Sequence, residues 1–150
     1  MNNNKQLVRV GVAVVVRSPK NSTKVLIGKR LLGAGVGKYA FPGGELDYGE
    51  TWKVTAIREV KEETGLDLTL TNMKCLFITN ILFPQEEQQW VVYVVEAEAK
   101  SELFINTEPE YCEGWKWVDV DELKTLDIFI STQQWLTYMD GSAQTQFQRC

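Results

Sequence analysis

The acidic side chains between Gly43 and Leu66 are the residues of this chain whose types and spacing could do chemistry. If the segment after residue 50 is helical, Glu59, Glu62 and Glu63 project within about a third of a turn of one another. Carboxylates this close repel one another unless a cation lies among them, and hard divalent ions prefer such oxygen ligands. The spacing indicates a site for Mg²⁺ or Mn²⁺, although three acids at helical spacing are also typical of a solvated helix face. The acids of the segment are Glu45, Asp47, Glu50, Glu59, Glu62 and Glu63.

A helix must position these acids, and the sequence predicts both of its ends. Thr51 is suited to cap the first turn, and Gly65 suits the left-handed position that ends a helix. Three residues give the helix an apolar side next to the acids, so that it can pack while its carboxylates face a cleft. These residues are Ala56, Ile57 and Val60.

Other residues of the segment are expected to orient the acids. Arg58 precedes Glu62 by four residues, and Glu50 precedes the helix, so Arg58 is placed to bind either carboxylate through charge-assisted hydrogen bonds. Gly43-Gly44 predicts a backbone turn that brings carbonyl oxygens close to the same ion.

Together these residues resemble the Nudix box, the signature of a hydrolase family. Its pattern is Gly-x5-Glu-x7-Arg-Glu-apolar-x-Glu-Glu-x-Gly-apolar, and the chain matches it without departure at Gly44, Glu50, Arg58, Glu59, Val60, Glu62, Glu63, Gly65 and Leu66. The resemblance implies an α/β fold, an α/β/α sandwich with a mixed sheet between helices. It also implies Mg²⁺, with Mn²⁺ as a substitute, bound by the three helical glutamates and the Gly44 carbonyl. Arg58 and Glu50 become the orienting pair, and Glu62 or Glu63 activates the water.

The resemblance extends beyond the box, through the stretches GVAVVV, LIGKR, FPGGELDYGETW and EPEYCEGWKWVDVDEL. These are similar to MutT-like Nudix enzymes of the plant and animal cytosol that hydrolyse ordinary or oxidised nucleoside triphosphates such as 8-oxo-dGTP. That group implies release of a nucleoside monophosphate and pyrophosphate, and a homodimer. A Nudix enzyme acting on ADP-ribose, a dinucleotide or capped RNA is the alternative. A silent binding module would be expected to have lost box acids.

Residues outside the box are expected to complete the site. Glu113 precedes a Trp motif where similar enzymes carry a further acid near the metal, and a surface glutamate at a strand end is the competing interpretation. The stretch Phe129-Ile130-Ser131 departs from the Phe-Trp pair of similar enzymes, which predicts weaker base stacking and broad base preference. The residues expected to bind substrate are Gly43, Lys29, Arg30 and Phe129.

The composition predicts one domain over residues 1–150 and excludes several chemistries. The 150 residues are 44% apolar, and a net charge of −4 argues against duplex nucleic acid as a partner, because phosphate backbones require a basic face. The chain has no histidine, so Ser-His-Asp hydrolysis and HExxH zinc chemistry are excluded. A small nucleotide remains the expected partner.

The cysteines and the apolar runs predict the cellular compartment of the protein. The three cysteines are odd in number and lack CxxC spacing, which predicts free thiols in a reducing compartment. No apolar run approaches the ~20 residues of a membrane span, and MNNNKQLV does not resemble a signal peptide. We therefore expect a cytoplasmic protein that does not bind membranes.

The remaining pattern predicts strands around the central helix and a second helix near the end. Ser131 is expected to cap that last helix, which runs to about Met139. The loop at 31–37 contains three glycines and is expected near the cleft. Residues 1–6 and 141–150 are expected to be flexible. The predicted strands are 8–16, 24–30, 38–41, 72–83, 88–100 and 113–118.

Overall fold

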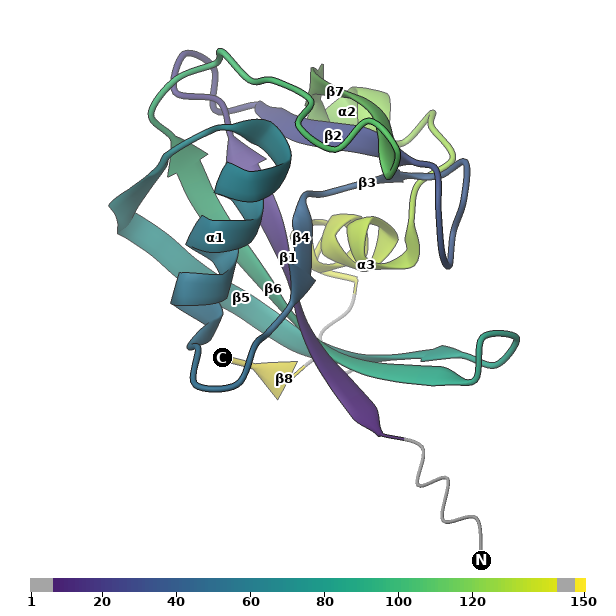
Figure 1. Ribbon diagram of the computed structural model, residues 1–150. Coiled ribbons are helices and arrows are strands. Elements are labelled where there is room, and N and C mark those ends of the chain that lie inside the picture. The colour runs from purple at the N-terminus through teal and green to yellow at the C-terminus, as the bar shows by residue number, and fades with distance from the viewer. Residues whose placement is uncertain (1–6, 143–147) are drawn as a thin grey trace, which may run out of the picture.

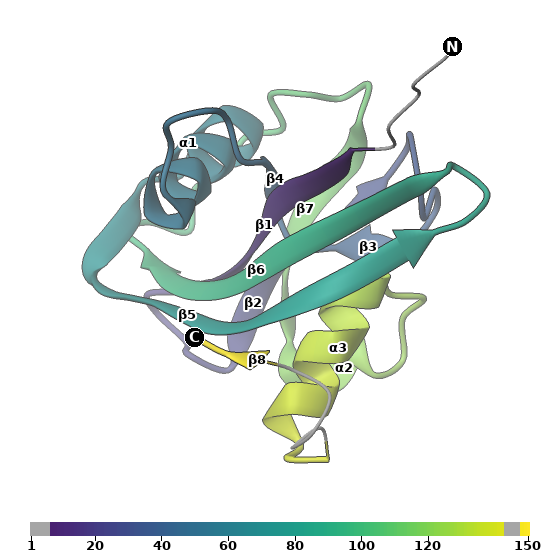
Figure 2. The same ribbon diagram turned by 90° about the horizontal axis from the view of Figure 1, so that it is seen from below.

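Two helices of the chain lie on opposite faces of one mixed sheet, as Figures 1 and 2 show. The computed structural model describes residues 7–142 and 148–150. This arrangement confirms the α/β/α sandwich. The elements are β1 (Val8–Arg17), β2 (Lys24–Arg30), β3 (Tyr39–Ala40), β4 (Gly43–Glu45), α1 (Trp52–Thr64), β5 (Leu68–Phe83), β6 (Gln88–Ala99), β7 (Cys112–Asp119), α2 (Val120–Leu123), α3 (Ile130–Met139) and β8 (Gln148–Arg149).

The sheet is mixed because one strand pair is parallel while the others are antiparallel. Its order is β3-β2-β1-β6-β5-β8, with β4 also paired to β1 and β7 to β2. β1 and β6 run parallel over ten register pairs. β1 therefore lies at the centre of the sheet, and strand β6 reaches it only after the chain has passed through α1 and β5.

The valine run of β1 belongs to two hydrophobic cores at once. Successive side chains of a strand point to opposite faces. Val12, Val14 and Val16 pack with α1 on one face, whereas Ala13 and Val15 pack in the core that includes residues of α3 on the other. A strand buried on both faces has few polar positions, which is the pattern predicted for residues 8–16.

The sheet opens between β1 and β2, and strand β4 occupies the opening. β2 is in register with β1 only at Arg17 and Val25, and β4 pairs with β1 over residues 11–13 instead. Gly43 makes this possible, because a Cβ there would lie 2.0 Å from the Val12 carbonyl oxygen. Gly43-Gly44 is thus part of a strand, and the prediction of a turn at this dipeptide is wrong.

The two long helices differ in how well the sequence predicted their starts. The Thr51 side chain accepts the Val54 N–H, and Gly65 adopts the left-handed conformation, so both caps of α1 are confirmed. The prediction for α3 is wrong: Phe129 is its N-cap residue, and Ser131 lies buried inside the first turn. The apolar side of α1 is also narrower than predicted, because Ile57 is exposed.

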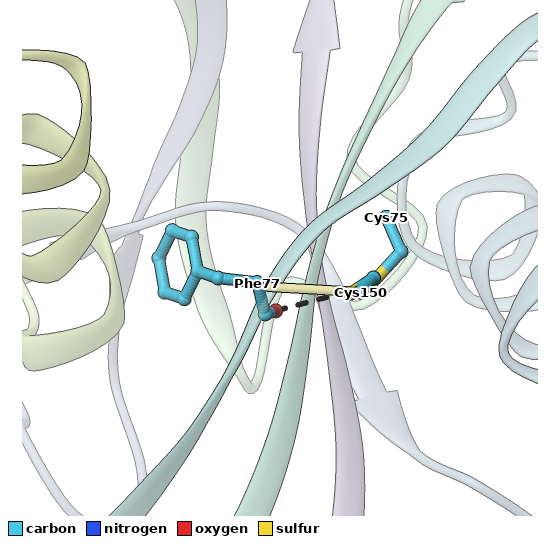
Figure 3. The surroundings of a disulfide bond; sticks show 3 residues. All are labelled: Cys75, Phe77 and Cys150. Atoms are coloured by element: carbon cyan, nitrogen blue, oxygen red, sulfur yellow. Dashed lines mark hydrogen bonds between the residues drawn. A yellow bond between two sulfur atoms is a disulfide. The ribbon is translucent and has the colours of Figure 1, made fainter. Parts of the chain in front are cut away.

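The cysteines correct a second prediction. Cys75 on β5 and Cys150 form a disulfide, which Figure 3 shows, and Cys112 is a buried free thiol. Two of the three cysteines are therefore not free thiols, and only Cys112 still agrees with the prediction of free thiols in a reducing compartment. The expectation of a flexible end is wrong for residues 148 and 149, which form β8 on the edge of β5. Residues 1–6 and 143–147 lie outside the described residues.

No helix in the described ranges is long and apolar enough to cross a membrane.

Candidate active site

Arg58 is the centre of an ion-pair network that joins α1 to the loop before it. Its Nε and Nη2 donate to the two carboxylate oxygens of Glu50 at 2.8 and 2.9 Å. Its Nη1 donates to Glu59 at 2.8 Å and to Glu62 at 3.3 Å. The bidentate pair with Glu50 has the planar geometry that favours arginine over lysine. Arg58 thus lies between three of the predicted site acids.

Glu50 is held by more than its ion pair. Its Oε2 also accepts the hydroxyl of Thr55 at 2.8 Å and the backbone N–H of Asp47 at 3.2 Å. The hydrogen bonds from Arg58, followed by that from Thr55, lower the pKa of Glu50 to about 2. Its carboxylate is therefore ionised at neutral pH, and the loop before α1 has a fixed conformation.

Glu59 and Glu63, one helical turn apart on α1, contact the two glycines of β4. The Gly43 N–H donates to Glu63 Oε2 at 2.9 Å. A Cβ on Gly44 would lie 2.3 Å from Glu59 Oε1, so only glycine lets the backbone approach this carboxylate so closely. Glu59 and Glu63 of α1 therefore lie directly on β4.

The electrostatics of this face favour a cation. Burial raises the pKa of Glu63 to about 8, and the nearby carboxylates of Glu59 and Glu108 add to the shift. Burial also raises the pKa of Glu59, against the effect of Arg58. Both carboxyls are held where negative charge is costly, and a bound divalent cation would remove that cost.

A divalent cation fits these residues by their chemistry. No three Asp, Glu, His or Cys side chains converge as a preformed metal site within residues 7–142 and 148–150. Arg58 instead binds Glu59 and Glu62, and Glu63 binds β4. The groups that would hold the ion are the carboxylates of Glu59, Glu62 and Glu63, together with the Gly44 carbonyl, an all-oxygen set of the kind Mg²⁺ prefers.

Two cavities meet beside this face. The first has a volume of about 320 Å³ and is lined by Glu63, Glu108 and Cys112 among others. The second, of about 400 Å³, extends over β1, β5 and β6 toward the start of α3. Arg30 and Gly43 line both cavities, so the two cavities adjoin, and we call them together the cleft.

Aromatic side chains surround the second cavity, which we call the aromatic cavity. Phe129 stacks on Phe83 with ring centroids 5.8 Å apart, and the Arg30 guanidinium lies 4.5 Å from the centroid of the Phe129 ring. Trp90 contributes a third ring, and Ser131 lies in the same lining. Phe129 and Ser131 therefore both line the aromatic cavity.

Two of the residues expected at the site lie elsewhere, and one acid was missed. The structure places Glu113 against Lys29, with 3.5 Å between carboxylate and ammonium, and neither residue belongs to the lining of these two cavities. Glu108 instead lines the first cavity, and its negative charge contributes to the raised pKa of Glu59 and of Glu63. It sits in an irregular segment before β7, where no periodicity in the sequence distinguishes it from Glu102 or Glu110.

Comparison with known proteins places the chain in a family. The model of the NUDIX domain matches residues 7–138. An RNA pyrophosphohydrolase of Erythrobacter litoralis is 29% identical over 118 residues, which is 68% of this chain and 71% of that protein. A MutT NUDIX hydrolase from Burkholderia pseudomallei has a TM-score of 0.75 at 24% identity, covering 87% of this chain and 97% of its own.

A further solved structure is the NUDIX domain of NrtR from Shewanella oneidensis, complexed with ADP ribose. It has a TM-score of 0.74 at 16% identity and covers 91% of this chain and 89% of its own. At these identities the solved structures establish the fold. The match of the family model over most of the chain, together with the complete box, shows that the protein belongs to the Nudix hydrolase family.

Proposed function

We propose that this Nudix hydrolase is a Mg²⁺-dependent nucleoside triphosphate pyrophosphohydrolase that converts (d)NTPs, including oxidised ones such as 8-oxo-dGTP, to the monophosphate and pyrophosphate. The observation that carries the proposal is the meeting of the acidic face and the aromatic cavity at Gly43 and Arg30. A nucleoside triphosphate has the same division, with a polyanion at one end and a flat base at the other. Nudix hydrolases as a family act on small nucleotide substrates.

In this proposal each end of the cleft has a separate task. The bound Mg²⁺ would neutralise the phosphate chain and acidify a water. A carboxylate of Glu62 or Glu63 accepts the proton of the attacking water, whose oxygen bonds to phosphorus while the phosphoanhydride bond to pyrophosphate breaks. Arg58 keeps Glu50 and the helical acids in place through its hydrogen bonds. Arg30 offers a cation between the two ends, beside Glu63.

A second candidate substrate is the 5′ end of RNA. Curated relatives that are 25–29% identical are named RNA pyrophosphohydrolase. The net charge of −4 weighs against a long polyanion as partner, since an RNA chain needs basic groups along its path. ADP-ribose is the third candidate, because it also joins a base to a phosphate chain. A silent binding module is disfavoured, because every box acid is present.

A substrate panel separates these candidates. We expect the four dNTPs and 8-oxo-dGTP to be hydrolysed with higher kcat/KM than ADP-ribose or a 5′-triphosphorylated RNA oligonucleotide. Several bases should be accepted, because Ser131 stands where similar enzymes carry the tryptophan of a Phe-Trp pair, which weakens stacking beside Phe129. Faster turnover of the RNA end than of every free triphosphate would overturn the proposal and support the second candidate. Faster turnover of ADP-ribose would support the third.

Assembly and location are parts of the same proposal. We propose a homodimer in the cytoplasm, on the resemblance to the MutT-like enzymes described above. Light scattering at micromolar concentration should give about twice the 17.1 kDa of one chain. A mass near that of one chain would reject the dimer.

A further inference from the structure

Gln88, at the start of β6, presents a fixed amide to the aromatic cavity. The indole Nε1–H of Trp90 donates to Gln88 Oε1 at 3.1 Å. An indole nitrogen can only donate, so this bond decides which end of the amide faces Trp90. The amide nitrogen, with two donor hydrogens, makes no hydrogen bond within the described part of the chain. Gln88 belongs to the lining of the aromatic cavity, and its amide nitrogen has no partner among the described residues that would compete with a ligand.

Trp90 itself is held in place from several sides. Its six-membered ring lies so close to β1 that a Cβ on Gly11 would be 3.1 Å from it. The Arg9 guanidinium lies 4.4 Å from the centroid of the Trp90 ring, and Arg9 forms an ion pair with Glu45 of β4. The amide of Gln88 is therefore positioned relative to the same strand that carries Gly43 and Gly44. A base held at this amide would have a fixed relation to the phosphate end.

The lining of the aromatic cavity is rich in hydrogen-bond donors and poor in acceptors. Gln88 and the terminal guanidinium nitrogens of Arg30 supply donors, whereas Arg9 donates through Nε and Nη2 to Glu45. No Asp or Glu side chain belongs to the lining formed by the described residues. The only side-chain amide oxygen in that lining accepts from Trp90, and the Ser131 hydroxyl can donate or accept. A base edge that carries an acceptor would be satisfied here more readily than one that carries an amino group.

We propose that Gln88 is a specificity-determining residue that selects bases with a carbonyl edge, namely 6-oxopurines and 4-oxopyrimidines, over their amino counterparts. The inference rests on the proposed function, since it assigns the base end of the same cleft. A base carbonyl accepts from the free amide N–H of Gln88. An amino group in the same place brings two donors together and leaves both without a partner, which costs about tenfold or more in binding.

The first test compares substrates that differ at this edge alone. We expect inosine triphosphate to exceed ATP, and UTP to exceed CTP, by about tenfold in kcat/KM. Gln88→Glu replaces the free donor with an acceptor and should reverse both ratios. The matched control is Gln89→Glu, which makes the same change on an exposed neighbour that points to the opposite face of β6. The control should keep the wild-type ratios.

A second variant tests the role of the indole N–H. Trp90→Phe keeps an aromatic ring beneath Arg9 but removes the donor that orients the amide. Gln88 can then present either its oxygen or its nitrogen to the base. Both ratios should fall toward one without reversing, which a purely steric role of Gln88 would not produce.

Binding of the product nucleotides tests the inference independently of turnover. We expect calorimetry to show tighter binding of inosine monophosphate than of AMP to the wild-type protein, and the reverse in Gln88→Glu. If no triphosphate is hydrolysed, the proposed function fails while this binding ratio still decides the inference. Equal affinities in the wild type, or a shift in Gln88→Glu no larger than in Gln89→Glu, would overturn the inference.

Discussion

The two ends of the cleft are built in different ways. At the acidic end, the side chains that contact Arg58 all come from residues 47–62, so a single loop and helix contain the network. At the aromatic end, the lining comes from β1, the loop at 31–37, both strands of the β5–β6 hairpin and the start of α3. The Arg58 network is therefore specified by one contiguous segment, and of the acids described at this end only Glu108 comes from elsewhere. The aromatic end is assembled from elements far apart in the sequence.

This difference implies a division of labour. The hydrogen bonds of Arg58 and the close approach of Gly44 to Glu59 leave little freedom at the acidic end, so substitutions there should affect the chemical step. Residues of the aromatic cavity reach it from separate elements, and none of them belongs to the Arg58 network. Substitutions there should affect which nucleotide binds and how tightly.

The largest expected effect is loss of turnover in Glu63→Gln. The substitution removes a charge from the proposed metal ligands at nearly constant volume, so kcat should fall by a factor of about 100 or more. The fold should be preserved, because the amide oxygen of Gln can still accept the Gly43 N–H and burial already disfavours a charge at this position. Steady-state kinetics at saturating Mg²⁺, with a thermal melt, measure both.

Glu122→Gln is the matched control for this variant, since it removes one carboxylate charge from α2. It should keep wild-type kinetics. Wild-type turnover by Glu63→Gln would show that Glu63 is not a catalytic residue. It would also contradict the proposed role of the acidic end.

A smaller effect, on KM rather than kcat, is expected for Phe129→Ala. The variant loses a ring of the aromatic cavity that contacts Phe83 and the Arg30 guanidinium, and base stacking contributes about 1–3 kcal/mol. We expect KM to rise about tenfold with kcat changed less than threefold. Phe104→Ala is the control, because that ring packs on Trp117 outside both cavities. A fall in kcat with KM unchanged would contradict the proposed division.

The smallest effect is a pH dependence of stability that comes from Glu50. Its pKa in the folded protein is about 2, below the ordinary 4.5, because Arg58 and Thr55 bind the ionised form. A lowered pKa stabilises the fold above pH 4.5, and this contribution is lost as the pH falls toward 2. The difference in unfolding free energy between wild type and Glu50→Gln should be constant near neutral pH and shrink over that range. A difference independent of pH would contradict the ion pair.

The same contrast explains what the sequence could predict. The helix with its caps at Thr51 and Gly65, and the placement of its glutamates on one side, depend on spacings within one segment, and these follow from helical geometry. The valine run of β1 predicted a strand buried on both faces for the same local reason. Fold class and the kind of chemistry were therefore accessible before the structure.

The remaining features depend on contacts between distant residues. The Cys75–Cys150 disulfide joins positions 75 residues apart, and no local spacing indicates it. Glu108 reaches the first cavity from an irregular segment, and the amide of Gln88 acquires its orientation only from Trp90. The start of α3 at Phe129 was missed because Ser131 is a strong capping residue by type, yet tertiary packing places it inside the helix.

Identification of the products tests the central claim most directly. Phosphorus NMR of the wild-type protein with one nucleoside triphosphate and Mg²⁺ distinguishes the bond that breaks. We predict equal amounts of nucleoside monophosphate and pyrophosphate, with no diphosphate, and no products from Glu63→Gln over the same time. Formation of a nucleoside diphosphate and inorganic phosphate, or an unchanged triphosphate under conditions where ADP-ribose is cleaved, would contradict the account.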